Sequence, residues 1–513
     1  MPTKVAFIGG GSVGFTRKLV RDILKVPELH DTHFALHDIS ERNLDMVRRL
    51  LEKDIAANEL PARLSTSPDR REALEGADYV INCTRIGGLE AFKLDIEIPL
   101  KYGVDQCVGD TLCAGGIMYG QRNVPQILAF QRDMAEVAAE DCLFLSYANP
   151  MAINTWAALD ARDRGEGVDT IGLCHGVEGG WMQIATVLMG DGDGRYGEGP
   201  EAWVREAHER VQITCAGINH QTWYIKILFD GREVGAEELL EGFENHPRFS
   251  RTEKVRIDVL RRLGCYSTES NGHLSEYVPW YRKRPEEIER WIDMSSWING
   301  ETGGYLRVCI EGRNWFETDF PQWLEEAGEP LEDYTRSREH ASYIIEALET
   351  GRRYRGHFNV RNRGVITNLP PDCIVEVPGY VDRLGVHIPV VGDLPMACAA
   401  TCRASVDVQR MAKGAAVRGD VRLLKQAMLH DPLTGAVCNP EEVWQMTDEM
   451  LVAQAEWLPQ YSKENIGAAR RRLADPKVET TDWQGAARRE PRTVEELREG
   501  QDAAVMDADK ADG

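Results

Sequence analysis

Cys174 and His220 are the two residues whose types suggest metal chemistry most directly. A thiolate and an imidazole together suit a borderline divalent cation, and two protein ligands leave coordination positions open for substrate oxygens. The alternative is a buried cysteine and a hydrogen-bonded core histidine, and their spacing alone leaves both interpretations open. His175, directly after the cysteine, is interpreted either as an acid or ligand or as an ordinary core histidine.

Other segments carry groups that transfer protons or bind oxygen atoms. Asp110 lies in the glycine-rich stretch 109–116, which is either a substrate loop with a proton donor or a plain turn. Tyr277 lies in the aromatic stretch 275–281, which is either core or, if a proton is removed from carbon, the location of a base. Three further residues are candidates for cofactor or substrate binding: Arg85 and Asn149 follow predicted strands, and Arg122 begins the helix after the glycine-rich stretch. The alternative for each arginine is a solvated surface charge.

A glycine-rich segment, residues 9–14, follows the chain's first apolar run and predicts a strand, a tight turn and a helix. Gly9 permits the turn, and Gly11 lets the backbone approach a pyrophosphate. Gly14 is expected to allow close packing of helix and strand. Ser12 lies in the same turn, where the N–H groups of a helix N-terminus favour phosphate.

Asp38 ends the second predicted strand, residues 33–38. At this offset from the glycines a carboxylate binds the adenosine ribose hydroxyls, and it favours NAD over NADP because a 2′-phosphate would be repelled. The alternative interpretation is an ordinary strand–helix turn with a solvated aspartate.

The first 190 residues alternate between predicted strands and helices, which indicates an α/β fold with a Rossmann-type doubly wound parallel sheet. A helix is expected over 124–138, with Pro125 in its first turn. Residues 191–484 are expected to form a second α+β domain, built onto the sheet, for substrate, metal and oligomerisation. Residues 485–513 are expected to be a charged, flexible tail. The predicted strands of the first part are residues 4–9, 33–38, 79–84, 143–147 and 170–173.

Composition narrows the class of protein. The formal net charge of −23 argues against nucleic-acid binding, which needs a basic surface. The chain contains no run of about 18 apolar residues, so a membrane span is not expected. The first predicted strand starts at once, which argues against a signal peptide, and the 12 scattered cysteines are typical of reduced thiols. These features predict a cytoplasmic enzyme.

Taken together, these segments resemble glycoside hydrolase family 4, the NAD- and metal-dependent glycosidases, which fall outside the usual two-carboxylate scheme. The resemblance runs in order along the chain and leaves out the acidic tail. The segments that carry it are Val5–Gly9, Gly109–Thr111 with Gly115–Gly116, Asn149–Ala152, Cys174–His175, Ala216–His220, Ser275–Trp280 and Val375–Val381.

The resemblance implies an NAD- and Mn-dependent glycosidase, with another divalent cation as an alternative to Mn. The implied reaction is oxidation of the sugar at C3, deprotonation at C2, elimination of the aglycone, addition of water and re-reduction. It assigns the metal to Cys174 and His220. It implies Asp110 as the acid, with His175 as second choice. The implied base is Tyr277, with Tyr281 or His273 as alternatives, while Asn149 and Arg122 bind substrate and Arg85 binds cofactor or substrate.

Within this family, a histidine after the metal cysteine accompanies unphosphorylated α-linked sugars, so Cys174-His175 implies a neutral or anionic glycone of that class. The related NAD-dependent sulfoquinovosidases remain an alternative. Two further alternatives for the function are a lactate- or malate-type dehydrogenase and a non-catalytic NAD-binding protein. The family also implies a homodimer or homotetramer, a small glycoside as substrate, and no nucleic-acid or membrane partner.

Overall fold

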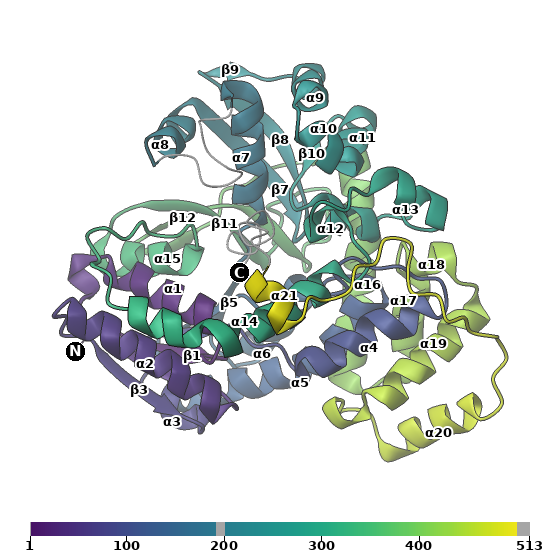
Figure 1. Cartoon of the computed structure of the whole chain (residues 1–513), viewed down its shortest axis with the longest axis horizontal. Coiled ribbons are helices and arrows are strands. Elements are labelled where there is room, and N and C mark those ends of the chain that lie inside the picture. The colour runs from purple at the N-terminus through teal and green to yellow at the C-terminus, as the bar shows by residue number, and fades with distance from the viewer. Residues whose placement is uncertain (1, 191–200, 500–513) are drawn as a thin grey trace.

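The computed structural model describes residues 2–190 and 201–499, which fold around one mixed sheet (Figure 1). Its first half is parallel in the order β3-β2-β1-β4-β5-β6, the classic dinucleotide-binding order. The strands of this half are β1 (Lys4–Ile8), β2 (His33–His37), β3 (Arg63–Ser67), β4 (Tyr79–Asn82), β5 (Leu143–Ser146) and β6 (Asp169–Gly172).

The alternation of side chains along β1 explains why helices cover both faces of this half. Val5 and Phe7 pack into one core with α1, α2 and α15, whereas Ala6 and Ile8 pack into another with α3, α5 and α6. The predicted Rossmann-type sheet is therefore confirmed. These helices are α1 (Val13–Leu24), α2 (Glu41–Ala57), α3 (Arg70–Leu74), α5 (Cys113–Val137), α6 (Met151–Asp163) and α15 (His340–Thr350).

Strand β3 was not predicted from the sequence. Its sequence, Arg-Leu-Ser-Thr-Ser, is polar, and four of its five residues are exposed or half-exposed at the sheet edge. A strand of this kind lacks the apolar run that marks a buried parallel strand.

Helix α5 corrects a second expectation, because it begins at Cys113 and leaves Pro125 in its interior instead of its first turn. The glycines that resembled a loop are helical and buried. A Cβ at Gly116 would lie 2.5 Å from the backbone of Thr111, so glycine is required where the loop carrying Asp110 crosses the helix.

The second half of the sheet is antiparallel and continues the first through β11, which pairs with β6 at Asn359 and Gly172. The second α+β part is thus built onto the same sheet, as expected. Its strands are β7 (Val211–Ile218), β8 (Gln221–Phe229), β9 (Arg232–Glu233), β10 (Tyr266–Ser267), β11 (Tyr354–Arg361), β12 (Ile374–Asp382) and β13 (Gly385–His387).

The remaining helices form two groups in Figure 1, a teal group at the top and a yellow-green group at the lower right. The first comprises α7 (Gly176–Met189), α8 (Glu201–Arg210), α9 (Ala236–Asn245), α10 (Phe249–Thr252), α11 (Lys254–Leu263), α12 (Asn271–Tyr277) and α13 (Pro285–Trp291). The second comprises α16 (Met396–Arg418), α17 (Val421–His430), α18 (Thr434–Val437), α19 (Pro440–Ala453) and α20 (Lys463–Leu473). Helix α4 (Gly88–Leu100) contacts α19, and α14 (Gly304–Glu326) contacts both α4 and α2.

The segment after Gly485 corrects the expected tail in part. The backbone N–H of Ala487 donates to Thr302 Oγ1 at 3.1 Å, and Arg492 pairs with Glu311 at 3.0 Å. Helix α21 (Val494–Glu499) then lies beside α14 (Figure 1). Within residues 485–499, contacts at Ala487, Arg492 and α21 therefore hold the chain against the protein, and the remainder of the expected tail lies outside the described residues.

Across the described ranges, we find no helix that is both long and apolar enough to cross a membrane. All 12 cysteines lie in the described ranges, and none of them forms a disulfide there.

Candidate active site

A pocket of about 330 Å³ opens at the carboxyl ends of the parallel strands, where doubly wound sheets bind ligands. It extends from Ser12 in the glycine turn after β1 to α7, as far as Gln183, and to Glu253, the residue before α11. The predicted site residues that line it are Ser12, Arg85, Asp110, Asn149, Cys174, His175 and His220.

The predicted metal pair comes together in this pocket. Cys174 follows β6, and its Sγ lies 3.4 Å from Nε2 of His220, which occupies the turn between β7 and β8. Glu269 joins them: its Oε1 lies 3.5 Å from the sulfur and 3.6 Å from the same nitrogen. Donors that share one ion at bonds of about 2.0–2.3 Å are separated by roughly 3.0–3.7 Å. The thiol, imidazole and carboxylate therefore fit a single divalent cation.

Backbone geometry holds two of these ligands in unusual conformations. His220 has φ +63° and Glu269 has φ +64°, a region that costs energy for residues other than glycine. Thr111 Oγ1 lies 2.8 Å from Nδ1 of His220, so the hydroxyl fixes the imidazole with Nε2 toward the cysteine. The strained turns are thus used to aim ligand atoms at one point.

The electrostatics of the three donors agree with a cation site. Burial works against ionisation of Glu269, yet the imidazoles of His220, His273 and His175 lower its pKa to about 2. Burial, with the charge of Glu269, raises the pKa of the Cys174 thiol well above its ordinary value. A bound divalent cation reverses the second effect, because a coordinating thiol loses its proton.

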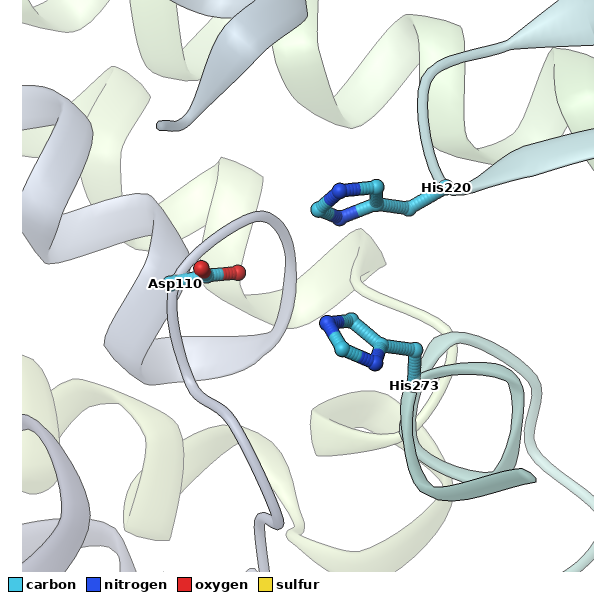
Figure 2. A group of neighbouring side chains, drawn as sticks. All are labelled: Asp110, His220 and His273. Carbon is cyan, nitrogen blue, oxygen red and sulfur yellow. The ribbon is translucent and has the colours of Figure 1, made fainter. Parts of the chain in front are cut away.

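Asp110, His220 and His273 form a second group, with ligand-type atoms within 4.8 Å of one another. Figure 2 shows the three side chains converging from a loop, a strand turn and a helix. Asp110 is held by two hydrogen bonds of 2.8 Å, from Asn149 Nδ2 and from Thr111 Oγ1. Asn149, expected to bind substrate, therefore also orients the expected acid.

His175 lines the pocket as the residue before α7, with its side chain 32% exposed. Its Nδ1 lies 3.8 Å from Oε1 of the buried Glu339. His175 thus reaches the pocket with a carboxylate on one side of its ring, and its role as an acid stays a prediction.

The three residues considered for the base differ in position. Tyr277 is fully buried, and its hydroxyl lies 3.5 Å from His220 Nδ1, on the side of the ring away from Cys174. Burial raises its pKa well above the ordinary value. Tyr281 donates to Asp258 at 2.9 Å. Of the three, His273 is part of the pocket lining, and the expected choice of Tyr277, which lies behind His220, stays a prediction.

The glycine turn at the other end of the pocket fits a dinucleotide. Gly9 has φ +86°, and a Cβ at Gly11 would lie 2.7 Å from Asp38 Oδ2. That oxygen accepts the Gly11 N–H at 2.9 Å, so the carboxylate expected to bind ribose is tied to the turn expected to bind phosphate. The expectation that Gly14 allows close packing of helix and strand is wrong. A Cβ at Gly14 would meet nothing within 4 Å, so packing does not require a glycine there.

The two arginines have different surroundings. Arg122 is fully buried, pairs with Asp95 at 2.6 Å and donates to the carbonyl of Ile86. It is not in the lining, and its expected role as a substrate ligand is corrected, because its guanidinium balances a buried charge between helices. Arg85 does line the pocket, with its guanidinium carbon 5.0 Å from the ring centre of Tyr119.

Models of two protein domains match most of the chain. "Family 4 glycosyl hydrolase" matches residues 4–190, and "Family 4 glycosyl hydrolase C-terminal domain" matches residues 215–434. The chain belongs to glycosyl hydrolase family 4. The resemblance inferred from the motifs is thus confirmed, and the protein is a glycosidase.

Relatives of this family 4 glycosidase include two alpha-galactosidases. The one from Rhizobium meliloti (strain 1021) is 61% identical over 505 residues, which cover 98% of this chain and 99% of the relative. The one from Bacillus subtilis (strain 168) is 32% identical and covers 89% and 99%. The solved 6-phospho-beta glucosidase from Thermotoga maritima, with manganese, NAD+ and glucose-6-phosphate, has TM-score 0.68, 22% identity and coverage of 89% and 99%. That last similarity shows the shared fold.

Sequence reasoning about this family 4 glycosidase missed Glu269 and gave His273 only as an alternative. Ser270 between them caps helix α12: its Oγ accepts the His273 N–H at 3.2 Å and lies 2.6 Å from Nδ1 of that ring. The Ser-x-x-His spacing before a helix was the available signal. The carboxylate one residue earlier had no signal of its own, because its partners come from distant segments.

Proposed function

We propose that this protein hydrolyses unphosphorylated α-galactosides with NAD as a regenerated cofactor and a divalent cation, preferably Mn²⁺. The observation that carries the proposal is the triad of Cys174, His220 and Glu269, with separations of 3.4–3.6 Å in the pocket that also holds the glycine turn. The choice of α-galactoside is supported by the 61% identity to an alpha-galactosidase over nearly the full length of both chains.

The cofactors follow from the residues present together with the relatives. NAD+ and manganese are named with the 6-phospho-beta glucosidase of Thermotoga maritima. The glycine turn with Asp38 suits NAD, and the thiol–imidazole–carboxylate set suits a borderline cation. When bound, NAD would accept and return the hydride at the sugar C3, and the cation would stabilise negative charge developing on the sugar oxygens.

The chain's own groups then account for the proton transfers. Oxidation at C3 acidifies the C2 proton, and His273, which lies in the lining beside His220, takes it. Asp110, oriented by Asn149, gives a proton to the departing aglycone oxygen, with His175 as the second candidate. Water then adds at C1 and the C3 ketone is reduced again, which leaves the free sugar.

Hydrolysis of 4-nitrophenyl α-galactoside tests the proposal. The protein, loaded with NAD and Mn²⁺ under reducing conditions, is expected to release 4-nitrophenol without accumulating NADH. In D₂O the released galactose should carry deuterium at C2. Aglycone release that needs no NAD, or a product without deuterium at C2, would contradict the mechanism. NADH accumulating on a hydroxy acid would instead support the dehydrogenase alternative.

The same experiment fixes the glycone when the α-glucoside, the 6-phospho-α-galactoside and the α-sulfoquinovoside are assayed beside the galactoside. A sulfoquinovoside that is hydrolysed faster than the galactoside would replace the proposed substrate and keep the mechanism. Assembly into a homodimer or homotetramer is part of the proposal, and light scattering after gel filtration measures it.

A further inference from the structure

The pocket wall formed by α7 and by the residue before α11 places a polar pair, Gln183 and Glu253, beside a buried arginine. Gln183 and Glu253 both line the pocket and are 2% and 3% exposed. Both bind Arg256, which is itself 1% exposed and is not a lining residue. Arg256 Nη1 donates to Gln183 Oε1 at 2.5 Å and to Glu253 Oε2 at 3.0 Å.

The remaining surroundings of Arg256 hold it behind this wall. Its Nη2 and Nε donate to the carbonyl of Ser267 at 2.7 Å and 3.3 Å. Its guanidinium carbon lies 4.2 Å from the ring centre of Tyr266, whose hydroxyl donates to Gln183 Oε1 at 2.6 Å. The guanidinium of Arg256 is thus contacted by Gln183 and Glu253 on the side of the pocket lining and by Ser267 and Tyr266 elsewhere.

On this wall the charge that faces the pocket is the carboxylate of Glu253. The other carboxylates of the lining are those of Asp110 and Glu269, which lie beside the lining imidazoles of His175, His220 and His273. Among the described lining residues, Arg85 supplies the guanidinium, and it lies over the rings of Phe92, Tyr119 and Tyr305. An anionic group brought to the Glu253 wall would lose its hydration and meet a like charge.

We propose that Gln183 and Glu253 screen Arg256 and thereby restrict this pocket to uncharged sugars. The inference rests on the proposed function and specifies its substrate class: the hydroxyls of a neutral glycone bind here, and a uronate or sulfonate is rejected. Specificity then depends on the guanidinium of Arg256, which Gln183 and Glu253 separate from the pocket. Removing one of these two side chains should let Arg256 attract an anionic sugar that the wild-type pocket rejects.

Gln183→Ala tests the screen, because it opens Arg256 Nη1 toward the pocket and leaves the pair with Glu253 in place. The substrates are 4-nitrophenyl α-galactoside and 4-nitrophenyl α-galacturonide, assayed with the NAD- and Mn²⁺-loaded protein. We expect wild-type kcat/KM to favour the galactoside at least 100-fold. Gln183→Ala should reduce that preference at least tenfold through a gain on the galacturonide. Equal wild-type rates, or an equal loss on both substrates, would overturn the proposal.

Two further variants make the result specific. Glu253→Gln keeps a side chain of the same size beside Arg256 and removes its negative charge. It should also lower the kcat/KM preference for the galactoside over the galacturonide. This variant tests the proposal even if Gln183→Ala fails to fold. The matched control is Gln131→Ala: Gln131 is equally buried, but it accepts from Val168 N and donates to Thr170 outside the pocket. Its preference should equal that of the wild type.

Binding measurements separate this inference from the proposed reaction. Calorimetric titration of the NAD- and Mn²⁺-loaded protein with galactose and with galacturonate measures the affinity for each sugar, and it does not depend on hydrolysis. A protein that prefers galactose, and whose Gln183→Ala variant gains affinity for galacturonate, supports the screen even if no glycoside is hydrolysed. A wild type that binds galacturonate as tightly as galactose refutes the screen even if galactosides are hydrolysed.

Discussion

The carboxylate of Glu276 accepts a hydrogen bond of 2.9 Å from the backbone N–H of Gly109, the residue before Asp110. Its other oxygen accepts the N–H groups of Cys107 and Val108 at 2.6 Å and 2.9 Å. Because Glu276 lies on the same helix as His273, these bonds fix the loop of the proposed acid against the helix of the proposed base.

Glu276→Gln should therefore lower activity by misplacing Asp110. An amide nitrogen cannot accept N–H groups, so at least one of the three bonds is lost. We expect kcat on the α-galactoside to fall at least tenfold, while the dissociation constants of NAD and Mn²⁺ change less than twofold. Steady-state kinetics and equilibrium titration measure these values. An unchanged kcat would show that the loop is held by other contacts.

The same carboxyl predicts a pH dependence of stability. Burial, opposed by the N–H bonds of Val108 and Gly109, raises the pKa of Glu276 from 4.5 to about 7. The folded protein thus binds this proton more tightly than the unfolded chain, so the free energy of unfolding falls as pH rises from about 4.5 to 7. Urea unfolding should show wild type losing stability relative to Glu276→Gln between pH 5 and 8. A constant difference would contradict the prediction.

Replacing a ligand of the triad should remove the cation and spare the dinucleotide. We expect Cys174→Ser to weaken Mn²⁺ binding at least 100-fold and Glu269→Gln about tenfold, measured from the electron paramagnetic resonance signal of free Mn²⁺. NAD affinity should remain within twofold, because the glycine turn is separate. Cys142→Ala, at a buried thiol directly before β5, is the control and should bind Mn²⁺ normally. Normal Mn²⁺ binding by Glu269→Gln would limit the ligands to Cys174 and His220.

The sequence predicts those parts of the site that depend on local pattern. The glycine turn and Asp38 follow from their spacing along one strand–turn–helix unit, and Cys174 and His220 were found as residue types with a resemblance to support them. Glu269 was missed because its partners are contributed by β6 and the β7–β8 turn, and only the folded chain brings them together. Arg122 was expected to bind substrate for the same reason: its counter-ion Asp95 lies on another helix, so the sequence does not show that the two residues pair.

Two glycines of the turn make a matched pair for testing the nucleotide site. A Cβ at Gly11 would lie 2.7 Å from Asp38 Oδ2 and 2.9 Å from Asn43 Cβ, whereas one at Gly14 would meet nothing within 4 Å. Gly11→Ala should therefore displace Asp38 and weaken NAD binding at least tenfold in fluorescence titration. Gly14→Ala should leave the affinity within threefold. The reverse order would mean that Gly14, and not Gly11, sets the approach of the pyrophosphate.

The choice of base can be decided by separating oxidation from deprotonation. His273 lies in the pocket lining with its ring 4.9 Å from that of His220, whereas the Tyr277 hydroxyl lies behind the imidazole. His273→Phe should still reduce bound NAD when galactoside is added, seen as absorbance at about 340 nm, because C3 oxidation does not need the C2 base. Exchange of the C2 proton with D₂O should slow about 10²–10⁴-fold, the usual contribution of a positioned base.

Tyr277→Phe is the counterpart in this experiment. It keeps the aromatic ring that stacks on His220 and removes only the hydroxyl, so it should retain C2 exchange within fivefold of wild type. If Tyr277→Phe loses exchange while His273→Phe keeps it, the buried tyrosine is the base. The pocket would then have to open toward Tyr277 when substrate binds, because its hydroxyl is at present covered by the imidazole of His220 and by Thr111.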